Sequence, residues 1–293
     1  MAGKKTKRVD PAAMKLPRVG VDSHAHLDME AFADDLDQVL ERAGGAGVAS
    51  TGNVFMGPWA YEKGRELFQG RNDVFFLLGI HPHDALQCTR DALSELESIF
   101  GSDDRVRALG EIGLDFYRQW SPFQAQREAF QSQLELARDL DLRVVIHSRE
   151  ADEEVVAALT DLGFKDRPLL WHCFGRNLEL ARVILSMGWT ISIPGPVTYP
   201  RNRELQQAAE AIPLDRMVLE TDCPFLAPEP WRGKRNEPAM TVFTAGKIAE
   251  LKGVPIRDVW QATGQTARRF FGLEDKFEAR RSKSEGKERD ISG

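Results

Sequence analysis

The amino-acid sequence predicts a (β/α)8 TIM barrel, an α/β fold in a single domain, and three observations support this prediction. Eight short apolar runs recur along the chain, and a helical pattern follows each of them. Several runs are apolar almost throughout, as expected for parallel strands that are covered on both faces. The repeats together span about 255 residues, close to the roughly 250 residues typical of this fold. A doubly wound open sheet would show the same periodicity and stays the alternative.

The eight predicted strands are short, and β-branched residues are frequent in them. In chain order they occupy residues 18–23, 47–54, 74–80, 106–112, 142–148, 168–174, 189–195 and 216–222. Each gap between two consecutive runs is long enough for one helix. We therefore expect every strand to be followed by a crossover helix, as parallel neighbours require.

Nine segments between and after these strands show helical periodicity. They cover residues 31–43, 58–69, 91–100, 121–137, 151–162, 178–185, 203–211, 240–252 and 255–271. In the fourth segment, Ser121 is expected to cap the helix, with Pro122 at the first helical position and Gln124 completing a capping box. Gly163 and Gly188 stand where helices commonly end.

The two ends of the chain differ in composition from the middle. Residues 1–17 are basic and contain no apolar stretch typical of a secretory signal, so we expect a flexible arm. Residues 274–293 are charged and nearly free of large apolar side chains, which predicts a disordered tail. The range 18–273 has no linker-like stretch and is predicted to be one barrel domain.

Composition restricts the classes of function. The chain has 293 residues and a net charge of −6, which argues against nucleic-acid binding by bulk electrostatics. A local cationic site or bound metal ions are compatible with that charge. The three cysteines are widely spaced and give no disulfide framework, so we expect a reducing, cytoplasmic location. No apolar run approaches the roughly 20 residues of a membrane span, so no membrane partner is expected.

All histidines lie at or just after the carboxyl end of a predicted strand. The six are His24, His26, His81, His83, His147 and His172. In a barrel the carboxyl ends of the strands converge on one face, and catalysis takes place there. We therefore expect these side chains, which are far apart in the sequence, to lie close together.

Two carboxylates repeat this placement, because Glu111 follows the fourth strand and Asp222 follows the eighth. A buried carboxylate needs a partner, and a metal ion is one such partner. His24 and His26 alternate along one strand, so both imidazoles can face one ion. Taken singly, each residue has an ordinary explanation, such as a hydrogen-bonded polar histidine or an acid paired with an arginine.

The joint pattern predicts a metal centre, and the mixture of nitrogen and oxygen ligands suits Zn, Mn or Mg. Its ligands would be His24, His26, Glu111, His147, His172 and Asp222. Cys173 and Cys223 each adjoin a ligand and are expected to point the other way, into packing. Asp22 shares a face with His24 and is expected to orient a ligand imidazole, whereas Asp28 is expected to cap a helix.

Seven motifs then carry a resemblance to a known family. They are VDSHAHLD, GIHPHDA, GEIGLDFYR, VIHSREADEE, WHCFGR, VLETDCPFLAP and RGKRNEP. In these motifs and their order the sequence resembles the TatD family of metal-dependent deoxyribonucleases, within the amidohydrolase-like barrels. The departures are modest: Gly20 replaces an apolar residue, Arg143 replaces a common proline, and the last helix lacks an asparagine before Ala267.

The resemblance implies two, sometimes three, divalent metal ions. His24 and His26 would hold one ion with Asp222, Glu111 would bridge the ions, and His147 and His172 would hold the other. In such a site Asp222 and Glu111 would be the catalytic residues, and Asp222 would accept the proton of the attacking water.

The implied function is a metal-dependent hydrolase of phosphodiester bonds, a deoxyribonuclease of the 3′-5′ exonuclease type. Its substrate would be DNA, as single strands or 3′ ends, and a monomer is expected. Candidate phosphate contacts on the same face are His83, Arg149 and Arg235. One alternative is a hydrolase of a small ester, amide or phosphoester, and another is a scaffold without activity.

Overall fold

Eight parallel strands form one sheet in sequential order, β1 to β8, in the computed structural model, which describes residues 8–273. The strands are β1 (Gly20–Ala25), β2 (Val48–Met56), β3 (Val74–Gly79), β4 (Val106–Asp115), β5 (Val144–Arg149), β6 (Leu169–Trp171), β7 (Thr190–Ile193) and β8 (Met217–Leu219). The sheet closes where Ala25 pairs in parallel with Cys223, just after β8. The predicted TIM barrel is therefore confirmed, and the open-sheet alternative is wrong.

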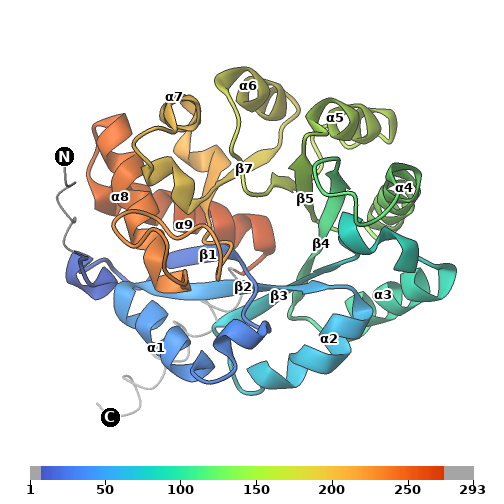
Figure 1. The fold of residues 1–293 in the computed structure, drawn as a ribbon, viewed down its shortest axis with the longest axis horizontal. Helices are drawn as coiled ribbons and strands as arrows, with labels where there is room; N and C mark the ends of the chain where they lie inside the picture. The colour runs from blue at the N-terminus through green and yellow to red at the C-terminus, as the bar shows by residue number, and fades with distance from the viewer. Residues whose placement is uncertain (1–7, 274–293) are drawn as a thin grey trace, which may run out of the picture.

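The helices surround the strands (Figure 1). They are α1 (Leu36–Ala46), α2 (Pro58–Gly64), α3 (Arg90–Ser102), α4 (Phe123–Asp139), α5 (Asp152–Asp161), α6 (Leu178–Ser186), α7 (Arg203–Ala211), α8 (Thr241–Lys252) and α9 (Ile256–Phe271). Two predicted helices are broken into shorter pieces. The 3-10 turn Glu30–Phe32 precedes α1, and the 3-10 turn Arg65–Phe68 follows α2.

The predicted capping box at the start of α4 is wrong. Pro122 is the N-cap residue, and no side chain caps the helix. The Ser121 hydroxyl instead donates to the carbonyl of His83 at 2.7 Å, so it tethers the loop after β3 to the start of α4. The two predicted helix stops are confirmed, since Gly163 and Gly188 follow α5 and α6 with φ of 76° and 82°.

Apolar side chains fill the barrel in two layers. One layer lies between the strands and the surrounding helices. The other lies inside the barrel and includes Phe270 and Phe271 from the end of α9. The ring of Phe271 lies 4.7 Å from that of Phe75, near the beginning of β3. The end of α9 therefore closes the amino-terminal end of the barrel and leaves the carboxyl end for the polar residues.

One of the sequence departures, Gly20, has a structural reason at the contact between α9 and β1, where Gly264 also lies. A Cβ at Gly20 would lie 1.9 Å from the Trp260 ring, and a Cβ at Gly264 would lie 2.3 Å from the Val19 carbonyl oxygen. Trp260 Nε1 donates to the carbonyl of Pro17 at 2.8 Å. The glycines let α9 pack directly on the backbone that begins β1.

The amino-terminal segment is more ordered than expected. Residues Pro11–Met14 form a 3-10 turn whose N-cap residue, Asp10, accepts a hydrogen bond from Ala12. Met14 and Leu16 pack against the outer apolar layer. The predicted flexible arm over 1–17 is therefore too long, while residues 1–7 and the predicted tail over 274–293 lie outside the described residues. Within residues 8–273, no helix is both long and apolar enough to cross a bilayer.

Candidate metal centre

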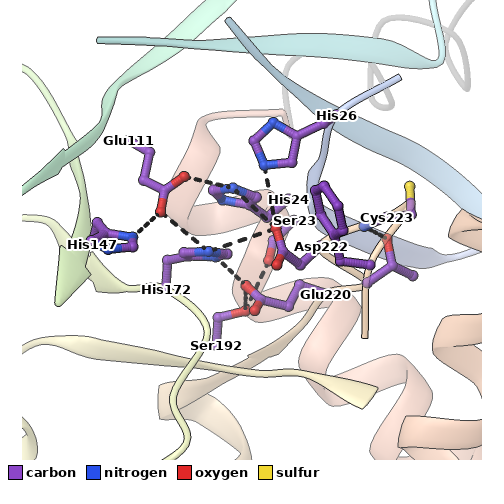
Figure 2. A network of polar contacts seen from close by, with 12 residues as sticks. Ser23, His24, His26, Glu111, His147, His172, Ser192, Glu220, Asp222 and Cys223 are labelled. Atoms are coloured by element: carbon purple, nitrogen blue, oxygen red, sulfur yellow. Dashed lines mark hydrogen bonds and ion pairs between the residues drawn. The ribbon is translucent and has the colours of Figure 1, made fainter. Parts of the chain in front are cut away.

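The six predicted ligands meet at the carboxyl end of the barrel (Figure 2). His24 and His26 come from the end of β1, Glu111 from β4 and His147 from β5. His172 follows β6 directly, and Asp222 is the third residue after the end of β8. Residues that are distant in the sequence thus form one cluster because parallel strands end on the same face.

Glu111 lies at the middle of this cluster. Its Oε1 atom is 2.5 Å from His147 Nδ1 and 3.5 Å from His172 Nε2, and its Oε2 atom is 3.4 Å from His24 Nε2. Burial opposes ionisation of this carboxyl, but the neighbouring imidazoles outweigh it and hold the pKa of Glu111 well below its usual range. Glu111 is therefore a carboxylate with both oxygens available between imidazoles.

Asp222 faces the same imidazoles from the other side. Its Oδ1 atom lies 3.3 Å from His26 Nε2 and 4.0 Å from both His24 Nε2 and His172 Nε2. Burial opposes ionisation, but the hydrogen bond with His26 and the neighbouring imidazoles lower the pKa of Asp222. Its side chain is 17% exposed, against 5% for Glu111, so Asp222 lies nearer the solvent.

The surroundings of His24 show whether a cation fits this cluster. Both of its ring nitrogens are buried without a hydrogen-bond partner among the described residues. Its ring stacks on that of His172 with 3.4 Å between centroids, and burial lowers the pKa of His24. A buried polar atom without a partner is unfavourable, and a neutral imidazole is a common metal ligand. The donors around His24 therefore fit a divalent ion.

Besides His172 with Cys173 and Glu220, three sets of donors lie close enough to hold an ion, each with ligand atoms within 4.8 Å of one another. The sets are His24 with His26 and Glu111, His24 with His172 and Asp222, and His81 with Glu111 and His147. Glu111 belongs to two of them, which agrees with a bridging position. His81, which was not among the six predicted ligands, joins the third set at 3.8 Å from Glu111.

Glu220 is a functional residue that the sequence reasoning missed. It is fully buried, and its Oε2 atom accepts hydrogen bonds from His172 Nδ1 at 2.8 Å and from the Ser192 hydroxyl at 2.5 Å. These contacts orient His172 so that Nε2 faces Glu111 and Asp222. The available signal was the spacing, because Glu220 precedes Asp222 by two positions in the motif VLETD.

Asp115 was also missed. Its Oδ2 atom lies 2.8 Å from His83 Nε2 and 3.3 Å from His147 Nε2. Burial opposes its ionisation, but the hydrogen bonds from His147, Arg118 and His83 lower the pKa of Asp115. Asp115 therefore links the predicted substrate contact His83 to the metal centre.

The three predicted phosphate contacts have different surroundings. His83 lies beside the cluster, 6.2 Å from His147 between ring centroids. Arg149 is exposed at the end of β5, with Cζ 4.0 Å from the Tyr117 ring centroid. Arg235 is engaged, because its guanidinium donates to Asp35 at 2.7 Å and to Glu237 at 2.9 Å. The role of all three stays a prediction, and the pairing of Arg235 counts against it.

Expectations for other residues of these motifs are in part wrong. Cys223 is fully buried, as expected, but Cys173 has its sulfur within 4.8 Å of donor atoms of His172 and Glu220. Asp22 orients no imidazole; it accepts hydrogen bonds from the backbone and hydroxyl of Thr221 at 2.8 and 2.6 Å. Asp28 caps no helix and accepts instead from Asn53 at 3.4 Å. Cys173 lies beyond the end of β6, where strand alternation no longer holds, whereas Asp22 lies within β1, whose register against β2 shifts between Asp22 and Ala25.

A (β/α)8 barrel with imidazoles and carboxylates gathered at the carboxyl ends of its strands defines a metal-dependent hydrolase. The chain belongs to the family of TatD related DNases, whose model matches residues 21–272. This confirms the resemblance that the motifs indicated.

Relatives and solved structures agree with the family. The uncharacterized metal-dependent hydrolase YabD of Bacillus subtilis is 36% identical over 86% of this chain and 98% of its own. The 3'-5' ssDNA/RNA exonuclease TatD of Pantoea ananatis is 34% identical over 86% of this chain and 99% of its own. The crystal structure of YJJV, a TatD homologue from Escherichia coli, has a TM-score of 0.81 and 27% identity, covering 87% of this chain and 98% of its own.

Proposed function

We propose that the protein hydrolyses phosphodiester bonds of DNA and releases nucleotides from the 3′ ends of single strands. The observation that carries the proposal is Glu111, a buried carboxylate shared by two donor sets at the face of the barrel that is open to substrate. Relatives named as 3'-5' ssDNA/RNA exonucleases support the choice of substrate and polarity.

Two divalent ions, Mg, Mn or Zn, fit the donors. His24, His26 and Asp222 would hold one ion, His147 and His172 the other, and Glu111 would lie between them. His81 offers a donor for a third ion. When bound, such ions supply a Lewis acid and lower the pKa of a coordinated water.

The protein's own groups then have separate tasks. Asp222 is ionised and partly exposed, so it can accept the proton of an attacking water. Glu111 stays ionised because imidazoles surround it. Glu220 holds His172 in one orientation through Nδ1.

Exposed aromatic side chains near the centre suit single-stranded DNA. Trp120, Phe225 and Tyr117 are 68%, 51% and 50% exposed. The ring of Trp120 lies 4.4 Å from His83, and that of Phe225 lies 6.5 Å from His26. Exposed rings of this kind stack on bases irrespective of sequence. Of the aromatic residues named here, only Trp120 was a candidate from the sequence.

The decisive experiment compares cleavage of several substrates by metal-free protein reloaded with Mg, Mn or Zn. The substrates are 3′- and 5′-labelled single-stranded DNA, double-stranded DNA, RNA and a panel of small esters. We expect mononucleotides from the 3′ end of single-stranded DNA. Hydrolysis of small esters without any nucleotide release would show that the nuclease assignment is wrong.

A pair of matched variants tests the residues. Asp222→Asn removes the proton acceptor, and we expect a loss of at least about a hundredfold in kcat. Asp139→Asn makes the same change on the exposed end of α4 and should leave kcat unchanged. Equal cleavage by the two variants would rule out Asp222 as a catalytic residue.

A further inference from the structure

A group of arginines lies at the opposite end of the barrel from the metal centre. A cavity of about 340 Å³ is lined there by Arg18, Ser50, Asn72, Arg105 and Arg107, among others. Ser50 is the third residue of β2 and Arg107 is the second residue of β4, which places the cavity at the amino-terminal ends of the strands. No residue of this cavity, which we name the amino-terminal pocket, belongs to the metal centre.

One arginine of this pocket, Arg107, has no anionic partner among the described residues. The Nε atom of Arg107 is buried without a hydrogen bond, and its side chain forms no ion pair within residues 8–273. Arg107 is only half-buried, but its buried Nε atom lacks an acceptor, so this position favours an anion from outside the described fold.

The nearest acidic side chains are already engaged. Asp103 accepts from Arg105 at 2.8 Å and from Tyr61 at 2.9 Å. Asp73 accepts from Arg71 at 3.2 Å, and Arg18 approaches it only to 4.0 Å. Neither carboxylate pairs with Arg107, so the pocket keeps an excess of positive charge.

A second arginine adds to that charge. The carbonyl of Arg143 accepts a hydrogen bond from Leu109, two residues along β4 from Arg107. Burial and the neighbouring charge of Arg107 lower the pKa of Arg143. Arg143, which directly precedes β5, thus lies near Arg107, and within residues 8–273 neither guanidinium forms an ion pair.

We propose that the amino-terminal pocket binds a phosphate group, carried by inorganic phosphate or by a small phosphate ester. Guanidinium forks match the oxygens of a phosphate, and Ser50 and Asn72 supply neutral donors beside them. The volume lies at the lower end of the range of small-molecule sites, so it suits a small molecule.

The test uses full-length protein in the presence of a chelator and measures binding of inorganic phosphate and deoxyadenosine monophosphate by calorimetry at constant ionic strength. We expect Arg107→Gln to weaken binding about tenfold or more, since hydrogen bonds to charged groups are strong. Arg182→Gln, the same change on an exposed position of α6, should bind like the wild type. Arg107→Lys keeps the charge but loses the fork, and its affinity should lie between the two.

The two ligands distinguish the sources of the phosphate. Tighter binding of the nucleotide would identify a phosphate ester as occupant, and equal affinities would identify inorganic phosphate. Absence of binding to the wild type, or equal affinities of Arg107→Gln and Arg182→Gln, would overturn the proposal. A double variant combines Glu274→Gln with Asp275→Asn. If only this variant binds phosphate, the proposal would also be overturned, because the chain's own carboxylates would then occupy the amino-terminal pocket.

Discussion

Glu111 is the residue on which the other groups of the metal centre converge. Four imidazoles, those of His24, His81, His147 and His172, have a ring nitrogen within 4 Å of its oxygens. Of these four, His147 and His172 have raised pKa values and supply the counter-charge, whereas burial lowers the pKa of His24 and of His81. The imidazoles and an incoming cation therefore compete for the same carboxylate.

Metal binding should release protons as a consequence. Despite burial, Glu111 raises the pKa of His147 to about 9, and Glu220 raises that of His172 to about 10. Both rings are protonated at pH 7.5 in the metal-free protein, and a metal ligand must be neutral. We expect metal affinity to increase with pH up to about pH 10, where the second of these rings has lost its proton.

Calorimetry in buffers with different ionisation enthalpies checks this, because the released protons are taken up by the buffer. At one pH, the apparent heat of metal binding should differ between Tris, which has a high ionisation enthalpy, and a phosphate-free buffer whose ionisation enthalpy is low. Identical heats, together with an affinity that is constant from pH 6 to pH 9, would show that His147 and His172 are already neutral.

The Glu220→Gln variant tests the orientation of His172. An amide accepts a weaker hydrogen bond from Nδ1, so we expect metal affinity to fall by about 10- to 100-fold. The control is Glu179→Gln, which makes the same change on an exposed position of α6. Equilibrium dialysis measures both, and an unchanged affinity in Glu220→Gln would assign Glu220 a purely structural role.

At the scale of elements, the close approach of β4 to β5 sets the position of Glu111 relative to His147. Gly110 and Gly113 flank this stretch of β4. A Cβ at Gly110 would lie 2.6 Å from the Val145 carbonyl oxygen, and a Cβ at Gly113 would lie 1.9 Å from that of His147. The motif GEIG thus allows the contact between the two strands as well as supplying a ligand.

Gly113→Ala should separate the strands and destabilise the fold. Its φ of 148° and the contact with His147 leave no room for a side chain. We expect the free energy of unfolding to fall by at least about 2 kcal/mol. Gly101→Ala, in α3 with open space around it, should instead raise it by roughly 0.5–1 kcal/mol. Denaturant unfolding of both variants distinguishes a steric effect from a general effect of alanine.

A second prediction at the scale of elements concerns the contact of α9 with β1. Gly20→Ala places a Cβ against Trp260, and overpacking of this kind costs about 1–3 kcal/mol. In a Trp260→Leu background the same change should cost less, because the ring is gone. The double-mutant cycle from denaturant unfolding should give a coupling of at least about 0.5 kcal/mol. Additive effects would mean that Trp260 does not restrict Gly20.

For the whole molecule, the net charge of −6 restricts how DNA can bind. Under the proposed function, the metal centre and rim cations such as Arg149 would contact the phosphates. With two or three phosphate contacts, the logarithm of affinity for single-stranded DNA should fall with the logarithm of salt concentration with a slope of about −2. Anisotropy with an uncleavable phosphorothioate oligonucleotide measures it, and a slope of about −5 or steeper would require an extended cationic surface.

The repeating pattern was sufficient to predict the whole barrel and the meeting of the six ligands. Strand ends are marked by the change from apolar to ionisable residues, and parallel strands bring those ends together. For the same reason the imidazole of His24 and the carboxylate of Asp222 were predictable as neighbours, although they are far apart in the sequence.

The positions of Glu220, Asp115 and Cys173 were not predictable in this way. Glu220 and Cys173 follow the ends of β8 and β6, where alternation no longer holds, and the contacts of Asp115, the last residue of β4, depend on its side-chain rotamer. Cys173 has a φ of 48° and Asp222 a φ of 54°, so both leave the extended conformation on which parity is based. The pairing of Arg235 with Asp35 joins residues 200 positions apart, and no periodicity in either segment indicates it.

The seam between β1 and the segment after β8 has a consequence for synthesis on the ribosome. Asp22 binds Thr221 across 199 positions, and the backbone of His24 accepts from Asp222 at the same place. His24 and His26 emerge early, yet they acquire Glu111 and Asp222 as neighbours only when nearly the whole domain has left the exit tunnel. A nascent chain that stops before this seam therefore has no complete set of ligands, and the hydrolytic centre arises with the last step of barrel closure.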